Sequence, residues 1–138
     1  ISYQPDNHEH MVRLRQEKVD RIAADIAGVE LDEEDGAELL VVGWGSTWGA
    51  ITAGVRRLRA TGERISQAHL THLNPLPADL GDVLARYPKV LCPELNLGQL
   101  AMLLRSRYLV DVASFTKVAG LPFGAAEMEV RMREELAR

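Results

Sequence analysis

Residues 39–51 read Leu-Leu-Val-Val-Gly-Trp-Gly-Ser-Thr-Trp-Gly-Ala-Ile, an apolar run that breaks into a glycine-rich turn and resumes as a helix. The run from Glu38 to Val42 has no polar alternation, which is typical of a parallel strand covered on both faces. Three glycines let the backbone turn sharply without Cβ clashes: Gly43, Gly45 and Gly49. This stretch therefore predicts the start of an α/β domain.

The turn departs from both nucleotide-binding motifs. Trp48 occupies the place of the third glycine in a dinucleotide fingerprint, and no acidic residue follows at the end of the next strand. A phosphate-binding loop needs Lys and then Ser or Thr after its last glycine, whereas Gly49 precedes Ala50. We expect Ser46 or Thr47 to cap the next helix, and the free N–H groups of such a turn can receive a phosphate or carboxylate.

The composition fits one globular domain. The chain has 138 residues, of which 46% are hydrophobic and 26% charged, and its net charge of −4 argues against a general nucleic-acid binder. Its single cysteine, Cys92, cannot form an internal disulfide and is expected to be buried in a reducing compartment. No apolar stretch is long enough to cross a membrane, so we expect a cytoplasmic protein without membrane partners. Because it begins with Ile1, we expect a segment cut from a longer polypeptide.

Helical and strand patterns alternate along the chain. Residues 1–28 are expected to lead in from a preceding domain, with an amphipathic helix over His10–Ile26 that ends at Gly28, and residues 29–138 are expected to form one α/β domain. The acidic stretch Glu30–Glu38 is interpreted as a solvated connector. After the first strand we expect further strands over 64–70, 89–93 and within 108–115, and helices over 51–61, 80–87, 97–104 and 124–138. This order predicts a three-layer doubly wound, mostly parallel sheet of four or five strands.

Metal binding and nucleophilic catalysis find little support in the sequence. His8 and His10 lie near the terminus, and no cysteine lies near either histidine pair. His69 falls near the end of a predicted strand, so it is a better candidate for a polar contact than for a metal ligand. A buried strand position raises the pKa of the Cys92 thiol. The sequence around Ser46 lacks the second glycine of a hydrolase elbow, because Trp48 stands there.

Three polar residues follow the predicted strand at 89–93. Asn96 is expected to cap the next helix, and Gln99 can bond back as in a capping box. Glu94 places a carboxylate at the carboxyl end of a strand, where sheets of this kind present residues to a ligand or a neighbouring domain. The candidate cofactor-binding or interface residues are therefore Gly43, Gly45, Ser46, Thr47, Glu94, Asn96 and Gln99, and no catalytic residue is assigned.

Three motifs in order resemble one enzyme family over nearly the whole chain. They are Gly43-Trp44-Gly45-Ser46-Thr47-x-Gly49, His69-Leu70-x-x-Leu73-Asn74-Pro75-x-Pro77 and Val90-Leu91-x-Pro93-Glu94-x-Asn96-Leu97-Gly98-Gln99-Leu100. They are similar to the C-terminal domain of the alpha subunit of 2-oxoacid:ferredoxin oxidoreductases, most of all the 2-oxoglutarate-using members. The segment from Asn7 to Val19 resembles the junction with the preceding pyrimidine-binding domain.

The resemblance implies a fold like the C-terminal domain of transketolase, with a mainly architectural role. It implies an oxidoreductase that uses thiamine diphosphate, magnesium, a 4Fe-4S cluster and coenzyme A to convert a 2-oxoacid into an acyl-CoA and reduce ferredoxin. The expected partners are the preceding domains of the alpha subunit, the beta subunit and ferredoxin. None of these cofactors is expected to bind this chain alone, and the isolated segment is expected to be inactive.

Two other interpretations remain open from the sequence. The chain is an autonomous α/β domain that binds a small ligand or phosphate through the Gly43–Gly49 turn, or it is an interaction domain anchored by Trp44 and Trp48. Replacing Gly45 with a bulky residue would abolish binding in the first case. Full burial of both indoles would exclude the second.

Overall fold

A five-stranded sheet organises residues 3–138, which are the residues that the computed structural model describes, and its strand order is β1-β3-β2-β4-β5. Only β1 pairs in the antiparallel sense, with β3, and the other pairs are parallel. The strands are β1 (Glu30–Asp32), β2 (Leu39–Trp44), β3 (Ile65–Leu70), β4 (Lys89–Glu94) and β5 (Val112–Thr116). The predicted mostly parallel sheet is confirmed.

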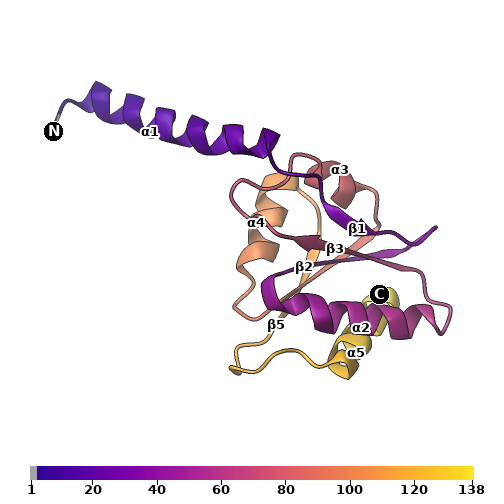
Figure 1. Ribbon diagram of the computed structural model, residues 1–138. Helices are drawn as coiled ribbons and strands as arrows, with labels where there is room; N and C mark the ends of the chain where they lie inside the picture. The colour runs from indigo at the N-terminus through magenta and orange to yellow at the C-terminus, as the bar shows by residue number, and fades with distance from the viewer. Residues whose placement is uncertain (1–2) are drawn as a thin grey trace.

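Helices cover both faces of this sheet (Figure 1). Those on the sheet are α2 (Trp48–Arg59), α3 (Leu80–Ala85), α4 (Gln99–Tyr108) and α5 (Ala125–Leu136), whereas α1 (Pro5–Arg21) lies apart, and 3-10 turns form at η1 (Ile22–Ala24) and η2 (Gly45–Thr47). One core cluster joins the sheet to α3 and α4, and the other joins it to α2 and α5. The three-layer arrangement follows from these two apolar interfaces.

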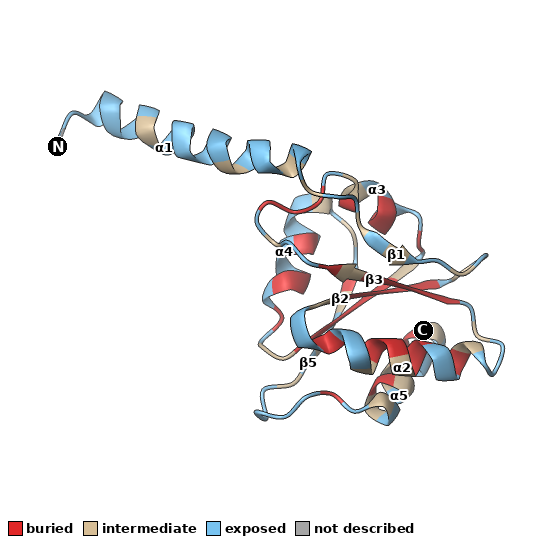
Figure 2. Cartoon of the chain, viewed as in Figure 1, coloured by how far each residue is buried: buried red, intermediate tan, exposed pale blue. Residues whose placement is uncertain are grey.

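The central strand β2 explains why the sequence around it is uniformly apolar. Leu40 and Val42 belong to the cluster under α3 and α4, whereas Leu39 and Val41 belong to the cluster under α2 and α5. All four side chains have no exposed surface, as Figure 2 shows for the middle of the sheet. A strand buried on both faces needs no polar alternation.

The acidic connector expected over Glu30–Glu38 is partly wrong, because its first three residues form strand β1. Leu31 packs against the cluster under α3 and α4, whereas the side chains of Glu30 and Asp32 point to the other face. Alternation over three residues is too short to predict a strand. Strand β1 forms because it pairs with β3, and its charged residues suit a strand at the edge of the sheet.

The N-terminal helix differs from its predicted bounds. It was expected to begin at His10, but α1 begins at Pro5, ends at Arg21 and continues as η1. Proline suits the first turn of a helix, because its missing N–H would have no partner there. No residue of α1 is buried, and the helix projects from the rest of the molecule on the side where β2 and β3 end (Figures 1 and 2). His8 and His10 are therefore exposed on a helix rather than in a frayed terminus.

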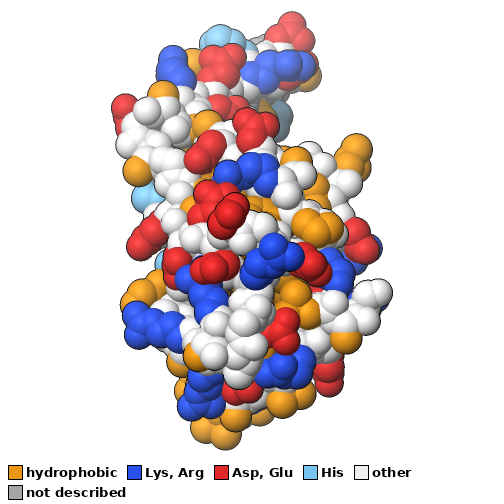
Figure 3. All heavy atoms as spheres, turned by 90° about the vertical axis from the view of Figure 1, so that its right-hand side faces the viewer, with side chains coloured by type: hydrophobic (Ala, Val, Ile, Leu, Met, Phe, Trp, Pro, Cys, Tyr) orange, Lys and Arg blue, Asp and Glu red, His pale blue; other side chains and the backbone are white. Residues whose placement is uncertain are grey.

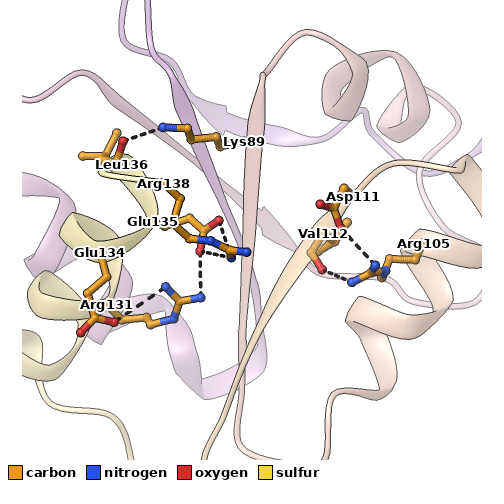
Figure 4. Close-up of polar contacts among 9 residues, drawn as sticks. All are labelled: Lys89, Arg105, Asp111, Val112, Arg131, Glu134, Glu135, Leu136 and Arg138. Atoms are coloured by element: carbon orange, nitrogen blue, oxygen red, sulfur yellow. Dashed lines mark hydrogen bonds and ion pairs between the residues drawn. The ribbon is translucent and has the colours of Figure 1, made fainter.

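A network of basic side chains fixes the end of α5 beside the start of β4. Arg131 and Arg138 both contact the carboxylate of Glu135, which is buried, and Lys89 donates a hydrogen bond to the carbonyl of Leu136 (Figure 4). The same view shows Arg105 of α4 bonded to Asp111 and to the carbonyl of Val112. Lys89 thus joins the end of α5 to the start of β4, and Arg105 joins α4 to the start of β5.

The amino-terminal edge of the sheet is covered by charged side chains of both signs (Figure 3). Ion pairs link Glu33 to Arg86, Glu38 to Arg64 and Glu63 to Arg133. Such exposed pairs contribute little stability but keep an edge soluble. Within residues 3–138, no helix has the length and apolar character needed to cross a membrane.

Candidate functional site

The carboxyl ends of β2 and β4 lie side by side, so the segments that follow them meet at one edge of the sheet. Two adjoining pockets open there, with volumes of about 180 and 290 Å³, and they share Trp44 and Asn96. Together they form what we call the carboxyl-edge groove, lined by Trp44, Gly45, Ser46, Thr47, Leu73, Leu95, Asn96, Gln99, Leu100 and Leu103. The glycine-rich turn and the segment from Glu94 to Gln99 thus meet in the structure.

The glycine-rich turn is closed by Thr47 rather than by a helix cap. The hydroxyl of Thr47 accepts a hydrogen bond from the N–H of Trp44 at 3.1 Å and donates one to its carbonyl at 2.9 Å. Helix α2 begins directly after this turn, and the residue at its N-cap makes no side-chain capping bond. Thr47 therefore holds the expected N-cap position of α2, but the expected side-chain cap is absent because its hydroxyl bonds to Trp44 instead.

The glycines of the turn have different reasons to be glycine. A Cβ on Gly43 would lie 2.3 Å from Cδ1 of Ile51 and 2.8 Å from the hydroxyl of Thr47, so close packing excludes one. Gly45 has φ of +56°, which favours glycine. Gly49 lies within α2 with open space around it, so the turn does not require this glycine.

Glu94 is fully buried, and its carboxylate is hydrogen-bonded to groups of the same chain. Its two oxygens accept hydrogen bonds from the N–H groups of Leu100 at 2.8 Å and Ala101 at 3.0 Å, and from the side-chain amide of Asn96 at 3.2 Å. A carboxylate is favoured at a helix N-terminus, where N–H groups have no partner within the helix. Glu94 thus holds the start of α4, and both oxygens are already engaged.

The predicted cap by Asn96 needs correction. Helix α4 begins at Gln99, and its N-cap is Gly98 with φ of 90°. The side-chain oxygen of Asn96 accepts hydrogen bonds from the N–H groups of Gly98 at 2.7 Å and Gln99 at 3.3 Å, which forms a turn before the helix. Gln99 is the first helical residue and lines the groove, so it does not occupy the third position of a capping box.

The chemistry of the groove is apolar with a few neutral polar groups. None of its lining residues is charged, and its hydroxyls, Ser46 and Thr47, have no base beside them among these residues. The segments that wall the groove also carry exposed apolar side chains, Leu97 in the loop after β4 at 78% and Met102 on α4 at 65% exposure. Neither indole is fully buried, because Trp48 is 50% exposed and Trp44 lies partly open in the groove. Such a surface suits packing against protein or an apolar ligand portion.

Sequence reasoning missed four walls of the groove: Leu73, Leu95, Leu100 and Leu103. They come from the loop after β3, the loop after β4 and helix α4. Their spacing in the sequence matches ordinary core residues, so only the folded arrangement distinguishes them. Leu73 and Leu100 stood within motifs singled out in the sequence, but neither was assigned to a groove.

The remaining candidate residues offer no catalytic centre in the part of the chain that the structure describes. Burial raises the pKa of the Cys92 thiol, and the adjacent Glu94 carboxylate raises it further. Burial lowers the pKa of His69. No group of three or more His, Cys, Asp or Glu side chains among residues 3–138 is arranged to hold a metal ion.

Comparison with known proteins identifies relatives of this chain. No family model matches it. Over 138 residues it is 55% identical to 2-oxoglutarate oxidoreductase subunit KorA of Mycobacterium tuberculosis, an alignment that covers 99% of this chain and 21% of that subunit. The chain is homologous to part of KorA. It spans only about a fifth of the length of the KorA subunit that it matches.

Solved structures agree with the relation to KorA. The chain matches 2-oxoglutarate:ferredoxin oxidoreductase from Magnetococcus marinus, determined with 2-oxoglutarate, coenzyme A and succinyl-CoA bound, at TM-score 0.88 and 32% identity. That match covers 98% of this chain and 24% of the other. The homology to KorA is therefore accompanied by a shared fold along almost the whole chain.

Two more distant structures test the predicted fold. A split-gene transketolase matches at TM-score 0.60 and 19% identity, over 75% of this chain and 40% of its own. The alpha chain of a probable 2-oxoacid ferredoxin oxidoreductase from Thermoplasma acidophilum matches at TM-score 0.56 and 24% identity, over 80% and 98%. The predicted likeness of this KorA homologue to transketolase-type domains is confirmed at the level of fold.

Proposed function

We propose that the chain is the C-terminal domain of the alpha subunit of a 2-oxoglutarate:ferredoxin oxidoreductase. The observation that carries this proposal is the 55% identity to KorA along the whole chain. In the complete complex, 2-oxoglutarate is decarboxylated oxidatively, its succinyl group is transferred to coenzyme A, and the electrons reduce ferredoxin. We place the complex in the cytoplasm, with a beta subunit as partner.

The residues of this chain do not fit the cofactors that the family uses. A 4Fe-4S cluster needs several thiolates, whereas the chain has one cysteine, which is buried. Thiamine diphosphate requires a divalent cation to hold its diphosphate, and residues 3–138 contain no cluster of ligands for one. We therefore assign these cofactors to other parts of the complex and derive no catalytic step through them here.

The role that the geometry supports is docking of the preceding domain. Helix α1 leads in from the N-terminal side and buries no residue, although Val12, Val19 and Ile22 lie along one face. It projects on the side where the strands end and the carboxyl-edge groove opens (Figure 1). A preceding domain seated there would cover α1 and the groove together. Residues 1–28 then form the connection, with Ile1 and Ser2 outside the described residues, and 29–138 form the domain.

In this arrangement the candidate residues chosen from the sequence contribute to packing against the preceding domain. Gly45, Ser46, Thr47 and Asn96 shape the walls of the groove, and Gln99 offers its amide to the polar backbone of whatever covers it. Gly43 and Glu94 act beneath the surface, the first by admitting Ile51 and the second by holding α4.

An activity assay of the complete complex tests the proposal. The full-length subunit and its beta partner should reduce a low-potential viologen dye only when 2-oxoglutarate and coenzyme A are both present, and this chain alone should not. Pyruvate serves as the substrate control. If the complex shows no 2-oxoacid-dependent reduction, and this chain alone is stabilised against heat by a phosphate compound, the domain is an autonomous binding module instead.

A further inference from the structure

A second pocket, of about 190 Å³, lies between helix α2 and the neighbouring strands β1 and β3 at one side of the sheet. It shares no lining residue with the carboxyl-edge groove. The sheet face is polar here, because Glu30 pairs in register with His69 and Asp32 with Gln67. Helix α2 contributes Trp48, Thr52 and Arg56 to the opposite wall. A polar strip facing a packed helix needs an explanation.

Part of this polarity is satisfied within the chain. Asp32 accepts hydrogen bonds from Arg59 and from the amide of Gln67, each at 2.9 Å. By contrast, Glu30 and Arg56 make no ion pair or hydrogen bond within residues 3–138, although both line the pocket. The pocket thus presents the Glu30 carboxylate on the strand side and the Arg56 guanidinium on the helix side, neither of them engaged in a direct ion pair.

Two buried polar atoms at the same pocket also have no partner. They are the hydroxyl of Thr52, a residue only 7% exposed, and Nδ1 of His69. Leaving such a group unbonded costs free energy. Both residues line the pocket, so a bound molecule that reaches them can supply the missing hydrogen bonds.

We propose that this pocket binds a small molecule that carries both a carboxylate and an ammonium group. Arg56 donates to the carboxylate, Glu30 accepts from the ammonium, and Thr52 and His69 supply further hydrogen bonds. The half-exposed indole of Trp48 covers the carbon chain between them. A volume equal to about six liquid waters admits only a few carbon atoms.

Ligands of one charge suit the site less well. An anion without an amino group would leave the Glu30 carboxylate without a direct partner, and a cation without an acid group would leave Arg56 without one. A metal ion is disfavoured too, because residues 3–138 hold no cluster of three ligating side chains.

Calorimetric titration of the complete complex tests this proposal. The probes are glycine, β-alanine and 4-aminobutyrate, which separate the two charges by increasing distances, with propionate and ethylamine as single-charge halves. We expect one zwitterion to bind about tenfold or more tightly than either half. Arg56→Gln and Glu30→Gln should each remove that gain, and Thr52→Val should weaken binding several-fold.

Arg57→Gln is the matched control, because Arg57 lies next to Arg56 on α2 and reaches only Glu129 at 3.8 Å. It should leave binding unchanged. Equal affinity for propionate and the zwitterions, or equal binding by the Arg56 variant and the unchanged protein, would overturn the proposal, as would no binding of any probe. Arg56 and Glu30 are exposed, so these variants keep the test valid even if Thr52→Val unfolds.

Discussion

Glu94 shows how one buried side chain positions a helix that the neighbouring sequence alone would not start. Its carboxylate bonds to two N–H groups of the first turn of α4, and through Asn96 it also fixes the loop that forms a wall of the groove. The predicted local cap by Asn96 fails because the effective acceptor comes from the end of β4. A carboxylate six residues before the N–H that it binds cannot be distinguished in sequence from one that faces a ligand.

Replacing Glu94 with Gln should therefore destabilise the fold. The amide group puts N–H donors opposite the N–H groups of Leu100 or Ala101, so a buried bond is lost, and we expect the free energy of unfolding to fall by about 2–3 kcal/mol. Urea denaturation measures the loss. Glu134→Gln is the control, since its 3.9 Å contact with Arg131 is exposed and should be worth under about 1 kcal/mol. Equal stability of both variants would contradict this role of Glu94.

Cys92 should resist alkylation in the native state. Burial raises the pKa of its thiol, and the Glu94 carboxylate nearby raises it further, so little thiolate forms at neutral pH. Iodoacetamide at pH 8 should leave the thiol unmodified in the folded protein and modify it fully in urea, as measured by intact mass. Rapid native labelling would show that β4 opens to solvent.

At the scale of elements, most strands and helices are predictable because each has enough residues for its own periodicity. The strands β2, β3 and β4 and the helices α2 and α5 occupy the predicted stretches within a few residues. The exceptions depend on contacts distant in sequence: β1 exists through its pairing with β3, and the groove walls Leu73 and Leu103 meet only in the fold. The spacing of apolar residues along the chain carries no information about contacts between segments that are distant in sequence.

Replacing two glycines of the glycine-rich turn with alanine should change the stability of the protein in opposite directions. Gly43→Ala should destabilise the protein by about 1–3 kcal/mol, because its Cβ would overlap Ile51 and the hydroxyl of Thr47. Gly49→Ala should stabilise it by up to about 1 kcal/mol, since Gly49 lies in α2 with open space around it. Urea midpoints of the two variants give both signs. A loss of stability in the Gly49 variant would show that the turn requires all three glycines.

At the scale of the whole molecule, two apolar surfaces without partners on one side imply a missing neighbour. Helix α1 buries none of its residues, and the segments that wall the groove carry the exposed Leu97 and Met102. A helix with an apolar face and no partner is not stable by propensity alone. We therefore expect the rest of the polypeptide to stabilise α1 and the groove together.

Leu97→Glu and Val12→Glu in the full-length subunit test this docking. Both side chains are exposed in this chain, at 78% and 49%, so neither change should alter the stability of the 138-residue chain itself. In the full-length subunit each places a charge in a buried interface, which opposes docking. Limited proteolysis should then cut the linker between η1 and β1 about tenfold faster than in the unchanged subunit. Val118→Glu, at a position 65% exposed in the loop after β5, should leave the rate unchanged, and equal cleavage of all three variants would place the interface elsewhere.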